Sequence, residues 1–147
     1  MTIFLINAVS TWFMVGLIWL IQMVHYPLFG YVGTTEFGTF HEKHKILITP
    51  VVGIVMIAEL VTTVIIMFQT PLGIPNWMGI VGILLLGVIW FSTLFLQIPY
   101  HNKLTTKFDE SVLKMLIKTN WIRTICWSLR GFIALIMLDI LIIKQNI

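Results

Sequence analysis

Four apolar stretches limit what this chain can fold into. They cover roughly residues 3–24, 46–68, 77–98 and 121–143, and each is close to the ~20 residues with which an α-helix crosses about 30 Å of hydrocarbon. Only 10% of the residues are charged and 59% are hydrophobic, whereas soluble domains carry about 25% charged residues. A water-facing surface cannot be built from so few charges. We therefore predict an all-α integral membrane four-helix bundle that forms one domain over residues 1–147.

The connections between these spans are unequal in length. A short segment with Pro71, Gly73 and Pro75 separates the second span from the third, because proline and glycine stop helices. The other two connections have about twenty residues each and contain helix-capping patterns at 34–36 and 109–111. We expect the second and fourth helices to start in these connections, outside the bilayer, and Pro50 to kink the second helix at the interface.

Basic residues predict the orientation of the bundle in the membrane. The two long connections and their flanks hold six lysines, whereas Lys144 is the lysine at the opposite side. The positive-inside rule then places both long connections in the cytoplasm and both termini on the outer side. The six are Lys43, Lys45, Lys103, Lys107, Lys114 and Lys118. A net charge of +3 that comes from loop lysines is no basic patch, and we expect no nucleic-acid partner.

The ends of the first and third spans have similar short sequences. The segment 22–27 reads Gln-Met-Val-His-Tyr-Pro, and the segment 97–101 reads Gln-Ile-Pro-Tyr-His. Each is followed by a long connection and another span. This pattern indicates two parallel helical hairpins related by an axis along the membrane normal.

The four histidines fall at helix ends on the predicted cytoplasmic side. They are His25, His41, His44 and His101. His41 and His44 share one helical face, and neutral imidazole is the commonest metal ligand. We predict a metal site from these four residues, for haem or for iron, copper or zinc, between which ligand type does not choose. The alternative is that the histidines are interfacial anchors. His41-Glu42-Lys43-His44 lacks the HExxH spacing of metalloproteases.

Charged residues inside the spans mark a second candidate site. Glu59 lies about thirteen residues into its span and Arg130 about nine into its own, which at ~1.5 Å per residue puts both within one turn of the same depth. A charge in hydrocarbon needs a partner, so we predict a Glu59–Arg130 ion pair. The alternative to a functional pair is a purely structural clamp.

The same reasoning predicts one polar cavity that opens toward the cytoplasm, with the histidines at its mouth. Its predicted lining residues are Gln22, Glu59, Gln97, Asn120, Arg123 and Arg130. On the fourth span, Asn120, Arg123, Trp127 and Arg130 share one helical face that must turn away from lipid. The candidate catalytic residues are Glu59, Arg123 and Arg130. The candidate cofactor-binding residues are Gln22, Gln97 and Asn120.

The last third of the chain carries three short motifs, at 99–104 (PYHNKL), 120–124 (NWIRT) and 127–131 (WSLRG). With them it resembles the anthrone-oxygenase-like family of small four-helix bacterial membrane proteins. This resemblance implies a bacterial inner-membrane bundle and oxygenation of aromatic substrates with little use of cofactors. His41, His44 and His101 have no counterpart in that pattern. Histidines at helix ends give a second likeness, to haem-linked membrane oxidases of tetrapyrrole synthesis.

Two classes of function follow from these features. The first is a metal- or haem-binding membrane oxidoreductase that acts on a small hydrophobic or anionic substrate. The second is a non-enzymatic carrier, channel subunit or lipid-binding protein in which the histidines are interfacial. Because four spans are few for alternating access, the second class would require a homo-oligomer.

Overall fold

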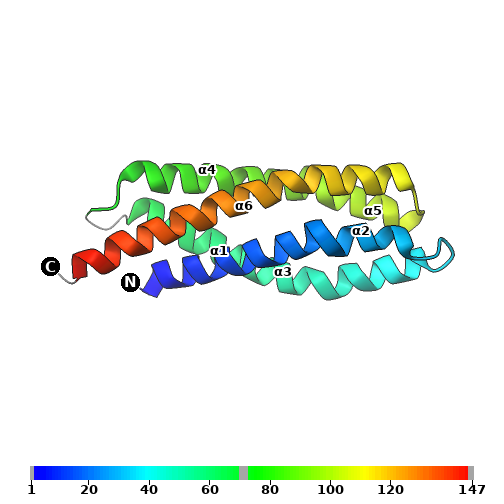
Figure 1. The fold of residues 1–147 in the computed structure, drawn as a ribbon, viewed down its shortest axis with the longest axis horizontal. Helices are drawn as coiled ribbons and strands as arrows, with labels where there is room; N and C mark the ends of the chain where they lie inside the picture. The colour runs from blue at the N-terminus through cyan, green and yellow to red at the C-terminus, as the bar shows by residue number, and fades with distance from the viewer. Residues whose placement is uncertain (1, 70–72, 146–147) are drawn as a thin grey trace.

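The computed structural model describes residues 2–69 and 73–145, which form long helices joined by short connections (Figure 1). Their bounds are α1 (Thr2–Leu20), the π-helical turn η1 (Ile21–His25), α2 (Tyr26–Leu28), the 3₁₀ turn η2 (Phe29–Tyr31), α3 (Phe37–Phe68), α4 (Asn76–Ser92), the π-helical turn η3 (Thr93–Gln97), α5 (Ile98–Thr106) and α6 (Glu110–Gln145). In this part of the chain, four continuous helical segments are long and apolar enough to cross a membrane: Thr2–Tyr31, Phe37–Phe68, Asn76–Thr106 and Glu110–Lys144. The predicted all-α four-helix bundle is confirmed.

The outside of the bundle is apolar along most of its length. Val9 and Ile54 are each 69% exposed, and Leu84, Phe91 and Phe132 are exposed to a similar degree. Contiguous apolar surface of this extent marks contact with lipid. With 32 and 36 residues, α3 and α6 are about 48 and 54 Å long at 1.5 Å per residue, which exceeds the ~30 Å of hydrocarbon. Both helices are long enough for the predicted extension beyond the bilayer, and the extension and its cytoplasmic side stay predictions.

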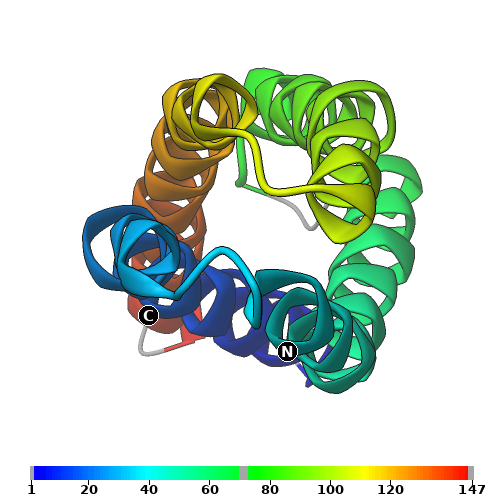
Figure 2. The ribbon, with the colours of Figure 1, turned by 90° about the vertical axis from the view of Figure 1, so that its right-hand side faces the viewer.

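The helices form a ring in which α1 packs against α3 and α6, and α4 packs against α6 and α3 (Figure 2). Both termini lie at one end of the bundle, and the connections 32–36 and 107–109 lie at the other (Figure 1). Gly131 permits close approach of α6 to α1, because a Cβ there would lie 3.2 Å from Val15 Cγ2 and 3.3 Å from the Trp12 ring. Small residues commonly serve this purpose between membrane helices.

A π-helical turn precedes a proline in both the first and the third helical segment. The backbone N–H of Tyr26, just before Pro27, bonds to the carbonyl of Ile21, and that of Ile98, just before Pro99, bonds to the carbonyl of Thr93. One extra residue in the turn accommodates the missing proline N–H. Each proline then stands in the first turn of a new α-helix, where proline is well tolerated. Both halves of the chain therefore contain a long helix, a π-helical turn, a helix that starts with proline and a second long helix, and the first half also has the 3₁₀ turn η2. The relation of the two hairpins by an axis along the membrane normal stays a prediction.

These turns carry two helices beyond the predicted membrane spans. The first and third spans were expected to end near residues 24 and 98, before connections of about twenty residues. Instead helix continues to Tyr31 and to Thr106, because Pro27 and Pro99 start helix here rather than end it. The connections shrink to 32–36 and 107–109. At the start of α3, Glu36 is the N-cap residue and forms no side-chain cap, so the cap expected at 34–36 is absent.

The cap expected at the start of α6 is present. Asp109 Oδ1 accepts hydrogen bonds from the Ser111 backbone N–H (2.8 Å), from Ser111 Oγ (2.6 Å) and from the Val112 backbone N–H (3.3 Å). The Ser111 hydroxyl and these amides favour the carboxylate and hold the pKa of Asp109 below its ordinary value. This bonding satisfies N–H groups that the first helical turn leaves without partners.

We expect Asp109→Ala to lower the thermal midpoint at pH 7 and to have little effect near pH 2. A carboxyl group whose pKa is lower in the folded state stabilises it above the unfolded pKa, and this contribution is lost as pH falls through the folded pKa. Thermal unfolding in detergent at both pH values measures the effect. Glu110→Gln, at an exposed residue that pairs with Lys114, is the control. Equal midpoints for Asp109→Ala and wild type at pH 7 would contradict the cap.

Candidate functional site

A cavity of about 230 Å³ lies inside the bundle between all four helical segments. Met14, Ile18, Met56 and Trp127 form an apolar part of its wall. The polar part comes from the end of the bundle that holds the histidines, with side chains from α2, α3, η3, α5 and α6. These polar lining residues are Tyr26, His44, Thr49, Thr93, Gln97, His101 and Arg123. A cavity of ~150 Å³ can hold a benzene-sized molecule, so this one is large enough for a small amphiphile.

Arg123 is the charged group on this wall, and its partners in the described residues are neutral. It is 6% exposed. Its Nε donates to Asn120 Oδ1 (3.0 Å), and its Nη2 donates to the same oxygen and to Gln97 Oε1 (3.3 Å). Weaker contacts reach Tyr26 Oη (3.4 Å) and Thr93 Oγ1 (3.5 Å). No carboxylate of the described residues pairs with it. The cavity therefore has a buried positive charge whose counter-charge is missing.

Three side-chain amides hold Arg123 in place. Asn120 directs its oxygen to the guanidinium, and its Nδ2 donates to Gln22 Oε1 (2.8 Å). The Gln22 amide nitrogen in turn donates to the Ile117 carbonyl (3.3 Å), and that of Gln97 donates to Thr119 Oγ1 (2.9 Å). Of the three predicted cofactor-binding residues, Gln97 lines the cavity, whereas Gln22 and Asn120 lie behind Arg123. Their role toward a cofactor stays a prediction.

The four histidines converge at the connection end of the bundle as two hydrogen-bonded pairs. His25 Nε2 lies 3.0 Å from His44 Nδ1, and His41 Nε2 lies 2.9 Å from His101 Nδ1. His44 and His101 link the pairs, with ring centroids 5.8 Å apart. In residues 2–69 and 73–145, no group of three or more His, Cys, Asp or Glu side chains is arranged to hold a metal ion. The metal site stays a prediction, and both ring nitrogens of His41 and of His101 bond to protein groups.

An unpaired donor also borders the cavity. The Trp90 side chain lines it, and its indole N–H is buried without a hydrogen-bond partner in the described part of the structure. Buried N–H groups of proteins are nearly always paired, and leaving one unpaired costs about 1–3 kcal/mol. A ligand with an acceptor oxygen would satisfy it. Trp90 was missed from the sequence.

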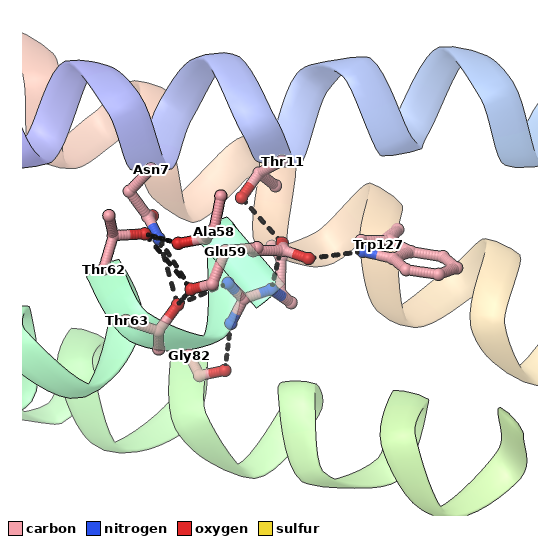
Figure 3. A network of polar contacts seen from close by, with 9 residues as sticks. Asn7, Thr11, Ala58, Glu59, Thr62, Thr63, Gly82 and Trp127 are labelled. Carbon is pink, nitrogen blue, oxygen red and sulfur yellow. Dashed lines mark hydrogen bonds and ion pairs between the residues drawn. The ribbon is translucent and has the colours of Figure 1, made fainter. Parts of the chain in front are cut away.

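Glu59 and Arg130 form the predicted ion pair, with Glu59 Oε1 3.0 Å from Arg130 Nε (Figure 3). The same carboxylate accepts from Thr11 Oγ1 (2.8 Å) and from Trp127 Nε1 (2.9 Å). The rest of the Arg130 guanidinium bonds to Thr63 Oγ1 (2.9 Å) and to the Gly82 carbonyl. Every charge in this network is balanced. Its geometry is that of a clamp between α1, α3, α4 and α6.

The prediction that one cavity contains all the buried charges is wrong. Glu59 and Arg130 do not line the 230 Å³ cavity, and Arg130 borders a separate pocket of about 20 Å³. Trp127 separates the two networks, because its N–H bonds to Glu59 while its ring lies on the cavity wall, 5.9 Å from Arg123 Cζ. The predicted catalytic roles of Glu59, Arg123 and Arg130 stay predictions.

Several residues of both networks were missed from the sequence. Asn7 and Thr11 on α1 are four residues apart, and Thr62 and Thr63 follow Glu59 by three and four residues. This spacing puts polar groups on one helical face and was a usable signal. Tyr26, Thr93 and Thr105 carry the same signal, since they lie four residues from Gln22, Gln97 and His101, respectively.

Fold and site together define an integral membrane four-helix bundle with a buried cation beside an internal cavity. No protein-family model, no curated protein and no solved structure matches the chain. The resemblance of the last third to anthrone-oxygenase-like proteins stays a prediction from its motifs.

Proposed function

We propose that this membrane protein binds a small, largely apolar organic anion inside its bundle, as a lipid-binding or carrier protein. The observation that carries the proposal is Arg123, buried on the cavity wall with neutral partners alone. An unpaired buried charge costs several kcal/mol, and a carboxylate of the ligand would remove this cost. Arginine is well suited to that role, since its planar fork binds carboxylates with two hydrogen bonds.

The other residues that line the cavity also suit an organic anion with a largely apolar structure. The orphan N–H of Trp90 offers a hydrogen-bond donor, and the Tyr26 hydroxyl can turn its hydrogen to a ligand. Met14 and Ile18 line the apolar part beyond them. Small-molecule sites commonly have this composition, a mostly apolar wall with a few converging polar groups.

Binding of 4-phenylbutyrate and of its neutral amide, 4-phenylbutanamide, tests this function in detergent-purified protein. Trp90 and Trp127 on the wall make tryptophan fluorescence a direct reporter. We expect the carboxylate to bind at least tenfold more tightly than the amide, and Arg123→Gln to abolish this preference. Lys118→Gln, which removes an exposed charge from the same helix, should preserve it. Equal affinities for acid and amide in the wild type would refute the proposal.

The convergence of the histidines supports a second candidate, the metal- or haem-binding oxidoreductase. Each pair presents two nitrogens 2.9–3.0 Å apart, close to the roughly 3.3 Å between two nitrogen ligands of a tetrahedral zinc ion. Aromatic substrates, which the family resemblance implies, would fit beside Trp90 and Trp127. Elemental analysis and a visible spectrum of protein without a histidine tag test this candidate. Near-stoichiometric iron, copper or zinc that is lost in His44→Gln would support it, and metal-free, colourless protein would refute it.

A further inference from the structure

The wall of the 230 Å³ cavity is closed toward α1 and α6 and open toward another side. Its lining residues from α1 and α6 are buried, as Met14 and Trp127 are. Lining residues from α3 and from the third helical segment reach the outer surface instead. Thr49 on α3 is exposed, and Leu94 and Ile98 are 49% and 44% exposed, although all three line the cavity. The cavity therefore opens sideways, between α3 and the η3–α5 part of the third segment.

This opening faces lipid rather than water. It lies within the second and third apolar spans. Ile54 and Phe95, which directly follow the lining residues Gly53 and Leu94, are large exposed hydrophobic side chains. Apolar surface of this kind marks contact with lipid in the bundle. A ligand that passes through the opening therefore comes from the bilayer.

The polar and the apolar parts of the cavity lie at different depths in the membrane. Counted from the end that holds the histidines, Arg123 is two residues inside the apolar stretch 121–143. Met14 and Met56 on the cavity wall are each ten residues inside their stretches, counted from the same end. At 1.5 Å per residue this depth is about 15 Å, half of the ~30 Å of hydrocarbon. The cavity thus spans one leaflet, with its cation at the membrane boundary and an apolar wall toward the middle.

We propose that the cavity takes up a long-chain fatty acid from the bilayer through this opening and binds its carboxylate at Arg123. This inference rests on the proposed function of the cavity. A fatty acid already has the matching arrangement in a bilayer, because its charge stays at the boundary and its chain points to the middle. It keeps this depth and direction when it moves sideways into the bundle. The first part of the chain contacts Met14 and Met56, and the rest passes out through the opening, so the cavity does not limit the chain length.

Gly53 is the lining residue of α3 from which a side chain can fill the opening. A Cβ at this position would meet no atom within 4 Å. A leucine therefore fits without a clash, and leucine also favours a helix more than glycine does. Gly87 on α4 has equally open surroundings and does not line the cavity. Gly53→Leu and Gly87→Leu thus form a matched pair of variants.

Photolabelling in phosphatidylcholine vesicles tests the inference. The probe is octadecanoate with a diazirine at mid-chain, and mass spectrometry of peptides locates the label. In the wild type, we expect label within 48–56 and 90–98 that excess octadecanoate removes and excess octadecanol does not. Arg123→Gln and Gly53→Leu should each lower this competed label about tenfold or more, and Gly87→Leu should leave it within about twofold of wild type.

The outcomes separate this inference from the function on which it rests. Binding of 4-phenylbutyrate without competed labelling would overturn the fatty acid as the ligand and leave the anion site in place. Equal competition by octadecanol and octadecanoate would remove the role of Arg123 in labelling and would also overturn the inference. Undiminished label in Gly53→Leu would overturn the sideways route. If that variant does not fold, Leu94→Trp fills the opening from its other side and decides instead. Absence of binding by either acid would refute the proposed function.

Discussion

Glu59→Gln should lower the free energy of unfolding by about 3–5 kcal/mol, the usual cost of breaking a buried ion pair from one side. Glu59 is fully buried and Arg130 is 4% exposed, so the substitution leaves an uncompensated guanidinium inside the bundle. The amide also replaces an acceptor by a donor, although Thr11, Trp127 and Arg130 all donate to the carboxylate. Equilibrium unfolding in mixed micelles, followed by circular dichroism, measures the loss.

A double-mutant cycle tests whether the loss comes from the pair. In an Arg130→Gln background, Glu59→Gln should lower the free energy of unfolding far less than in the wild type, because no buried charge is then left without a partner. Asp139→Asn changes an exposed carboxylate of α6 to its amide and should stay within about 0.5 kcal/mol of wild type. Stability of Glu59→Gln within about 1 kcal/mol of wild type would contradict the role assigned to this pair.

The fold could be predicted because hydrophobicity and span length act locally. Each stretch long enough to cross a membrane forms a helix, and Glu59 and Arg130 could be paired because depth follows from residue count at a fixed rise. The helix ends were harder. Pro27 and Pro99 lie just past the expected ends of their spans, yet each follows a π-helical turn and continues the helix. The sequence pattern does not show whether a proline ends a helix or starts one. That depends on whether packing at the connection end accommodates the extra residue of the π-helical turn.

The candidate site could be predicted in part, since an isolated helix pattern does not fix rotation about the helix axis. Arg123 and Arg130 are seven residues apart and were placed in one cavity, but Trp127 lies between their networks and divides them. Whether the histidines form one centre or two pairs depends on the same rotations. The two π-helical turns help to set them, since each extra residue turns the following helix by about 100°. Tyr26 bonds to His101 of another helical segment. This contact depends on how the segments pack, which no local sequence pattern shows.

Asn120→Asp should weaken binding of 4-phenylbutyrate at least tenfold without lowering the stability of the bundle. Arg123 already directs Nε and Nη2 to Asn120 Oδ1, so a carboxylate at this position forms an ion pair at once. Gln22, which now accepts from the Asn120 amide, can turn its own amide to donate instead, and the new ion pair offsets the loss of its hydrogen bond to the Ile117 carbonyl. Two unit charges about 4 Å apart attract by about 4 kcal/mol at an effective dielectric constant of 20, and a loss of 1.4 kcal/mol is a factor of ten in affinity.

Weaker ligand binding without a loss of stability distinguishes an arginine of a ligand site from a purely structural arginine. If Arg123 only connects helices, the new carboxylate stabilises the bundle and leaves ligand affinity unchanged. If Arg123 binds the anion, the new carboxylate also stabilises the bundle, but it takes the place of the ligand and lowers the affinity. Asn102→Asp adds the same charge at an exposed residue of α5 and should leave affinity within about threefold, since solvent screens such charges. If Asn120→Asp unfolds no more easily than wild type and still binds 4-phenylbutyrate with wild-type affinity, Arg123 does not hold the anion.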